Sequence, residues 1–172
     1  MPSNILDSYG MNLTTASPLA AESLREGVTT LLSQNGGTEE KFDEVVALDE
    51  GFAFGHGLQA FWRMQRARPA EAKESAERAQ ALASDCTRRE RQQIEAICLW
   101  VNGKGPQSIV MIKEHLSEFP RDAVLVRLAH RLYMLGCSGA GVPNFPPEYL
   151  ALLRGMDVVL SKEFGTEYLI AN

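Results

Sequence analysis

The chain has 172 residues, of which 45% are hydrophobic and 23% charged, a composition typical of a folded protein with a sizeable core. Its formal net charge of -5 argues against a general binder of nucleic acid or of anionic membranes, because such proteins are normally basic. Cys86, Cys98 and Cys137 lie far apart, so neither a disulfide framework nor a structural zinc site is expected. No signal peptide or apolar run long enough for a membrane span is visible, and we expect a cytoplasmic protein.

Apolar residues recur at helical spacing along the chain, between short corners rich in helix-ending residues. Ser17 and Pro18 are typical of a helix start, and the run Asn-Gly-Gly at 35–37 is typical of a helix end. No segment alternates apolar and polar residues as a strand would. Helices are therefore expected over 17–34, 38–50, 52–66, 70–84, 87–102, 106–119 and 122–135, with a further helix that starts at Pro146.

The corners between helix pairs recur at a regular interval. The stretches LDEGFA, SDCTRR and FPRDAV align on Glu50, Asp85 and Pro120, each 35 residues after the last. A helix-turn-helix unit of about 34 residues is the tetratricopeptide period. We expect a single domain over 1–172, with repeats near 16–50, 52–85, 87–120 and 122–172 and an irregular last pair.

Several longer stretches carry a more specific pattern. They are YGMNLTTASPLAAESL, ALDEGFAFGH, TRRERQQIEAICLWVNG, HLSEFPRDAVLVRLAHRLYMLG and GMDVVLSKEFGTEYLIAN, and they occur in this order over nearly the whole chain. Together they resemble motifs of the tetratricopeptide repeat protein 38 family, with Gln93 where that family often has histidine. The resemblance implies an all-α fold, a right-handed superhelix (α-solenoid) of antiparallel helix pairs. Family members are typically longer, so this chain corresponds to their N-terminal part only, and the resemblance supplies no catalytic motif.

Catalytic and metal sites are not predicted by the residue pattern. His56, His115 and His130 fall in different helices and form no H-E-x-x-H motif, whereas a zinc site needs three or four convergent ligands. There is no G-x-S-x-G or Walker A motif. We expect no metal, no cofactor and no catalytic residue. The alternative is a small-molecule-binding protein or enzyme with a pocket between the superhelix and the C-terminal tail, centred on His56 or His130, where a histidine would cluster with a carboxylate.

The expected binding surface is the concave face of the stack, which the first helix of each pair lines in such arrays. Several arginines on that face would make the groove basic and suited to an acidic peptide, because guanidinium groups pair bidentately with carboxylates. In the alternative interpretation these arginines are solvated or paired with Glu71, Glu74, Glu90 and Glu95. The pattern favours a non-enzymatic protein–protein interaction scaffold that binds a peptide or helix. The polar groove positions are Gln59, Arg63, Arg66, Arg88, Arg91, Gln92, Arg127, His130 and Arg131.

The last expected helix carries a broad apolar stripe that could mediate self-association. An uncovered stripe at the end of a repeat array would favour a homodimer that completes the solenoid. The alternative is that the final residues fold back over the stripe as a cap. The stripe consists of Tyr149, Leu152, Leu153, Met156 and Val159.

Overall fold

The computed structural model of the protein describes residues 5–137 and 145–164, and within the second range the side chains of 147–156. This part of the chain is all-α, as predicted, with eight α-helices and a short 3-10 helix, η1. Its only β pairing is an isolated bridge between Leu6 and Asn12. The elements are α1 (Pro18–Ser33), α2 (Thr38–Leu48), α3 (Ala53–Gln65), α4 (Pro69–Leu82), η1 (Ala83–Asp85), α5 (Arg88–Val101), α6 (Gly105–Glu118), α7 (Ala123–Met134) and α8 (Phe145–Phe164).

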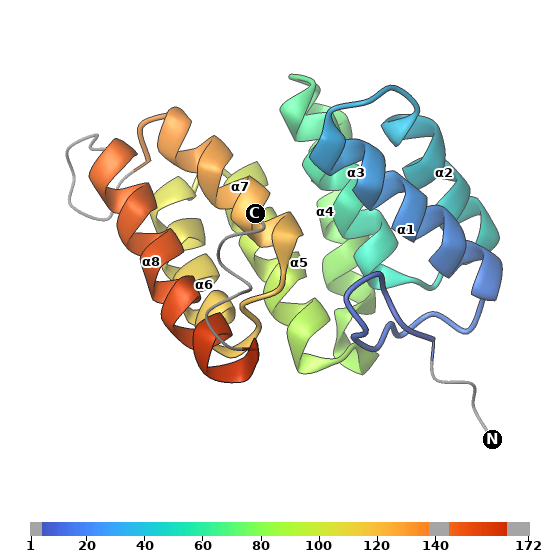
Figure 1. The fold of residues 1–172 in the computed structure, drawn as a ribbon. Coiled ribbons are helices and arrows are strands. Elements are labelled where there is room, and N and C mark those ends of the chain that lie inside the picture. The colour runs from blue at the N-terminus through green and yellow to red at the C-terminus, as the bar shows by residue number, and fades with distance from the viewer. Residues whose placement is uncertain (1–4, 138–144, 165–172) are drawn as a thin grey trace.

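The helices pack as pairs that follow one another along the chain (Figure 1). α1 packs on α2, α3 on α4, α5 on α6 and α7 on α8. The pairs join through contacts of α3 with α2, of α5 with α3 and α4, and of α7 with α6. In addition α1 contacts α7, so the first pair approaches the last one. Sequential pairwise packing is thus established, while the right-handed superhelix and the repeat boundaries stay predictions.

Side-chain caps begin two of the helices, α1 and α5. The Ser17 side chain accepts a hydrogen bond from the Ala20 amide (3.2 Å), and Pro18 occupies the first turn of α1. Thr87 and Glu90 form a reciprocal capping box at the start of α5. These local bonds satisfy amides that have no partner inside the helix, which is why the sequence could place the helix starts.

Small residues allow close packing between neighbouring helices. Ala72, Ala76 and Ala79 form the buried strip of α4. In α1, a Cβ atom at Gly27 would lie 2.7 Å from the ring of Phe42 in α2. Glycine and alanine at these positions let the helix axes approach, and the core fills the space between the pairs. None of the helices in the described part of the chain is long and apolar enough to cross a bilayer.

Ala67, in the corner between α3 and α4, has a φ of 59°. This left-handed conformation brings Cβ close to the backbone and is unfavourable for alanine. We expect Ala67→Gly to raise the free energy of unfolding by about 1 kcal/mol, measured by urea denaturation with circular dichroism. Ala81→Gly, at an exposed site within α4, should instead lower it by about 0.5–1 kcal/mol. Equal destabilisation by both changes would contradict the assignment of strain to Ala67.

Candidate functional site: a buried polar cluster beneath the N-terminal loop

Residues 5–17 form a tight loop that precedes α1, called here the N-terminal loop. The Leu13 amide donates a hydrogen bond to the Ile5 carbonyl (2.8 Å), and the Asp7 amide donates to the Met11 carbonyl (2.8 Å). Asp7 Oδ1 in turn accepts from the Met11 amide (2.9 Å). One carboxylate oxygen of Asp7 is therefore used to hold the shape of the loop, which leaves Oδ2 for a second partner.

The loop is bonded to the corners between helix pairs. Each short corner reverses the chain, so these corners lie at the same end of the stack as the start of α1 (Figure 1). Thr15 Oγ1 donates to Asp49 Oδ2 (2.5 Å) at the corner before α3. The Thr14 amide donates to Glu90 Oε1 (2.9 Å) at the start of α5, and the Thr14 hydroxyl donates to the other oxygen of that carboxylate. Glu90 thus caps α5 and holds the loop at once.

A cluster of buried polar side chains joins the loop to the helices beneath it. It consists of Asp7 of the loop together with Arg89, Gln93, His115 and Asp122, and is called here the buried polar cluster. Arg89 joins its two acids, with Nη2 2.7 Å from Asp7 Oδ2 and Nε 2.9 Å from Asp122 Oδ2. Gln93 Nε2 donates to the same Asp122 oxygen (2.5 Å), and His115 Nε2 lies 3.1 Å from it. The cluster therefore ties the loop, α5 and α6 to the corner before α7.

Asp122 is ionised within this cluster although it is almost fully buried. Burial alone would raise the pKa of its carboxyl group, but the hydrogen bond from His115 and the charge of Arg89 outweigh that effect and hold the pKa below its usual range. The pair of His115 and Asp122 has the geometry of a catalytic dyad. Since His115 is fully buried and its Nδ1 lies 2.9 Å from Gln92 Oε1, the pair has no access to a substrate.

The lowered pKa of Asp122 predicts a specific acid sensitivity. A carboxylate whose pKa is lower in the folded than in the unfolded chain stabilises the fold above the unfolded value of about 3.9, and this contribution is lost as the pH falls through the folded value. We expect the free energy of unfolding, measured in urea, to drop below about pH 4.

The Asp122→Asn variant should be less stable at neutral pH and show a weaker decline below pH 4 than wild type. Asp85→Asn, which removes an exposed carboxylate in η1, should keep the wild-type dependence. An unchanged acid profile in Asp122→Asn would mean that this residue does not carry the effect.

The N-terminal loop packs where the first helices of the pairs meet. Between the loop and these helices lies a cavity of about 10 Å³, close to the smallest that holds one water molecule. At this end of the stack the loop, rather than solvent, faces the first helices. The cavity is lined by Asp7 of the loop, Val28 of α1, Phe54 of α3, Arg89 of α5 and Val124 of α7, among others.

The predicted groove residues of α3 face the neighbouring helices. Gln59 is buried, and its Nε2 donates to Asp43 Oδ1 (2.7 Å) on α2. Arg63 Nη1 donates to Ser75 Oγ (2.7 Å) on α4, and its Nη2 lies 3.4 Å from Asp43. Arg66 is exposed, with its guanidinium 5.7 Å from the centre of a tryptophan ring. Gln59 and Arg63 therefore already have partners within the chain.

The predicted groove residues of α5 lie on the side that faces α6 or in solvent. Arg88 pairs with Glu118 of α6 (2.7 Å). Gln92 is buried against His115 of α6 (2.9 Å). Arg91 is exposed, and its Nη1 donates to a backbone carbonyl of the preceding corner (2.5 Å). The acidic partner of Arg88 is thus on the neighbouring helix α6.

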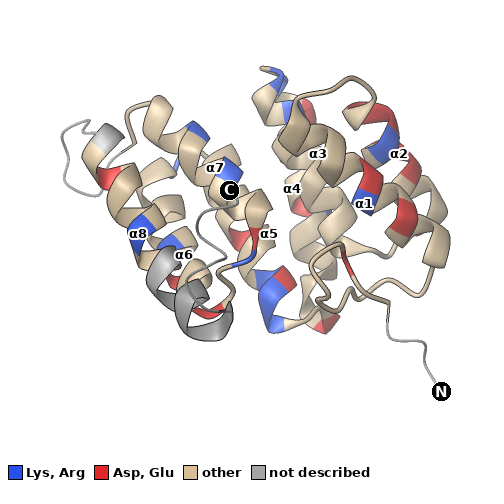
Figure 2. Cartoon of the chain, viewed as in Figure 1, with Lys and Arg blue, Asp and Glu red and all other residues tan. Residues whose placement is uncertain are grey.

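Two predicted groove residues of α7 lie on the same side of the helix as Val124, which lines the cavity beneath the N-terminal loop. Arg127 and Arg131 lie three and seven residues after Val124, so they fall on the same side of the helix. Arg127 Nε is buried with no hydrogen-bond partner among the described residues, and Arg131 is exposed. The His130 ring instead lies 5.4 Å from the ring of Tyr149 on α8. Basic residues as a whole are spread over several helices (Figure 2).

An open depression of about 600 Å³ lies between α3 and α4. His56 is at its wall, with Nε2 3.0 Å from the Glu50 carbonyl, and burial lowers the pKa of the imidazole. It brings a histidine near carboxylates, but it lies between α3 and α4 and not beside the described part of the C-terminal tail, where the alternative placed its pocket. Its lining also includes Gln59, Arg63, Glu71, Glu74, Ser75, Glu77 and Arg78.

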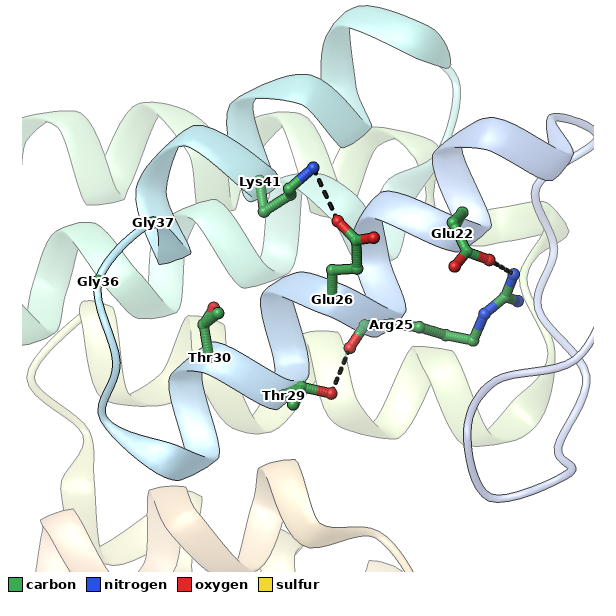
Figure 3. Close-up of a pocket in the computed structure, with 8 residues that line it drawn as sticks. All are labelled: Glu22, Arg25, Glu26, Thr29, Thr30, Gly36, Gly37 and Lys41. Atoms are coloured by element: carbon green, nitrogen blue, oxygen red, sulfur yellow. Dashed lines mark hydrogen bonds and ion pairs between the residues drawn. The ribbon is translucent and has the colours of Figure 1, made fainter.

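A shallow depression of about 520 Å³ lies between α1 and α2 (Figure 3). Its charged side chains are paired with each other: Lys41 with Glu26 (2.7 Å) and Arg25 with Glu22 (2.5 Å). The bonds to Glu26 and to Glu44 raise the pKa of the Lys41 ammonium group. A charged ligand would have to break these pairs, so we assign no site here.

The apolar stripe of α8 is partly used inside the chain. Leu152 is buried, and Tyr149 and Met156 pack against the core. Leu153 is partly buried. Val159, the last residue of the predicted stripe, lies outside the residues whose side chains are described.

Reactive groups are few in the described part of the chain. Burial raises the pKa of Cys86 to about 11 and that of Cys98 to about 12, so neither thiol is readily ionised at neutral pH. Burial also raises the pKa of Cys137. Among the described residues there is no group of three or more His, Cys, Asp or Glu placed to hold a metal ion.

The sequence reasoning did not single out the buried polar cluster as a site. Asp7, Arg89 and Asp122 are far apart in the sequence, so no local pattern indicates that they meet. A usable signal existed in the motif stretches. Thr87, Arg89, Glu90 and Gln93 belong to one stretch of the resemblance, and all but Thr87 are buried. In this fold those motif positions hold the helix corners and the loop together.

Comparison of the chain with protein-family models, with curated proteins and with solved structures found no match in any of the three.

Proposed function

We propose that the protein is a non-enzymatic interaction scaffold that binds an acidic segment of a partner protein on the face formed by α1, α3, α5 and α7. One observation carries this proposal: where these helices meet, the buried Arg89 binds the carboxylate of Asp7, which a non-helical segment delivers. A guanidinium held in place among helices is suited to recognise a carboxylate.

Two further features support a binding face along α7. Arg127 and Arg131 extend the positive charge of this face away from the loop, and the buried Nε of Arg127 has no hydrogen-bond partner among the described residues. A pre-formed helical surface binds a segment with little ordering cost of its own. The proposed site thus includes fewer residues than the groove expected from the sequence.

The proposal includes the architecture that the sequence suggests. A right-handed superhelix of the tetratricopeptide repeat protein 38 type agrees with the sequential helix pairs and with the motif stretches, whose polar residues bond to one another across the corners. The acidic composition and the separated cysteines are in keeping with a protein of the cytoplasm.

The test is capture of proteins from a native cell lysate on the immobilised chain, compared with Arg127→Glu/Arg131→Glu. We expect at least one protein to be retained by wild type and lost by this double variant. Lys73→Glu/Lys113→Glu, which changes exposed lysines of α4 and α6, alters the net charge equally and should retain it. Equal capture by both double variants, or no specific capture by wild type, would contradict the proposed face.

The depression between α3 and α4 favours a second candidate function, the binding of a small polar ligand. This depression is open to solvent, and it holds both cationic and anionic side chains that a small zwitterion could pair with. A thermal-shift screen of amino acids and other small zwitterions against wild type and His56→Phe would test it. A ligand that raises Tm of wild type but not of the variant would support this function, and an empty screen would remove it.

A further inference from the structure

The N-terminal loop already occupies the proposed binding face. Its Asp7 carboxylate lies 2.7 Å from Arg89 Nη2, and both side chains are 7% exposed. Leu13 supplies an apolar anchor in the core, while Leu6 remains 39% exposed. The loop therefore presents a carboxylate and an apolar side chain to the first helices, as a bound peptide would.

The fit between the loop and this face is incomplete. A small cavity remains between Asp7, Arg89 and the side chains of α1, α3 and α7. Arg89 Nη1, Gln93 Oε1 and Asp122 Oδ1 are buried, and none of them has a hydrogen-bond partner among the described residues. Part of the hydrogen-bonding capacity of the buried polar cluster is thus not used by the loop.

We propose that the N-terminal loop is a displaceable internal ligand, and that a partner segment with a carboxylate and an apolar residue at the spacing of Asp7 and Leu13 replaces it at Arg89. This inference rests on the proposed scaffold function and adds a way in which partner binding is regulated. The loop keeps Arg89 paired until a partner competes for it. A tethered segment competes at an effective concentration in the millimolar range, so only a partner with additional contacts, for example to Arg127 and Arg131, displaces it.

The experiment uses a fluorescent peptide with the sequence of residues 5–17, titrated with the full chain and followed by anisotropy. Asp7→Asn removes the charge that holds the tethered loop, and Asp85→Asn is the matched control at an exposed aspartate. We expect the peptide to bind the Asp7→Asn chain at least about tenfold more tightly than wild type or Asp85→Asn. A peptide in which Asp7 is asparagine should bind the Asp7→Asn chain about tenfold more weakly than the natural peptide. Equal binding of both peptides, or binding of neither, overturns the inference.

Hydrogen exchange of the wild-type chain gives a second measurement that needs no variant. The amides of Leu13 and Thr14, which bond to the Ile5 carbonyl and to Glu90, should exchange faster than the core amides of α5. Exchange at the rate of global unfolding would show that the loop does not open on its own, and would overturn the inference. If the lysate partner is lost in Arg127→Glu/Arg131→Glu while the peptide does not bind, the scaffold function stands and only the displaceable loop falls.

Discussion

Replacing Arg89 by methionine is expected to lower the free energy of unfolding by about 3–5 kcal/mol, because it leaves the carboxylates of Asp7 and Asp122 buried without their cation. Both carboxylates are nearly inaccessible to solvent, so bulk water does not compensate for the loss of the guanidinium. The measurement is urea denaturation followed by circular dichroism. In a chain of this size Tm should fall by about 2–4 °C for each kcal/mol.

The neighbouring residue provides the matched control. Arg88 also pairs with a carboxylate, that of Glu118, but its side chain is 61% exposed, so solvent screens the pair. Arg88→Met should leave the free energy of unfolding nearly unchanged. Similar effects of the two substitutions would mean that burial of the cluster does not set its contribution, which would contradict the role assigned to Arg89.

Replacing Glu90 by alanine is expected to lower the free energy of unfolding by about 2–4 kcal/mol and to release the N-terminal loop. Glu90 is fully buried, and its carboxylate accepts hydrogen bonds from the Thr87 amide (3.1 Å) and the Thr14 amide (2.9 Å). The change removes the Glu90 half of the capping box of α5 and one of the attachments of the loop together. Urea denaturation gives the stability, and hydrogen exchange of the Thr14 amide reports the loop.

Glu95→Ala is the control for this effect, since Glu95 lies on the exposed side of the same helix. It should change neither the free energy of unfolding nor the exchange rate at Thr14 by a measurable amount. If Glu90→Ala destabilised the chain without faster exchange in the loop, capping of α5 would account for the whole effect. The other attachments of the loop, through Asp7, Thr15 and the bond from Arg25 Nη1 to the Leu6 carbonyl (2.8 Å), would then be sufficient to hold it.

The charged residues of helix α5 fall into two groups with different surroundings. Arg89 and Glu90 face inward and join parts of the chain that are distant in sequence, whereas Arg88 and Arg91 face outward or toward α6. Successive residues of a helix point about 100° apart, so neighbours in sequence can have opposite environments. The residue type alone therefore does not distinguish a buried arginine from a solvated one.

The secondary structure could be predicted from the sequence because its signals are local. The apolar spacing of three and four residues, the caps at Ser17 and Thr87 and the glycines at the corners act within one or two helical turns. The all-α fold and the helix order followed from these signals. The contact of α1 with α7 could not be predicted in this way, because it joins residues about a hundred positions apart.

By itself the sequence determined that the protein is all-α, where its helices begin and end, and that they pack in sequential pairs. Only the tertiary structure decided which polar residues contact one another. Gln59 and Arg63, expected in an open groove, face Asp43 and Ser75, while Asp7 and Asp122 meet on one arginine. The reason is physical: helical periodicity fixes the side of a helix on which a residue lies, but which element covers that side depends on how distant helices and the N-terminal loop pack.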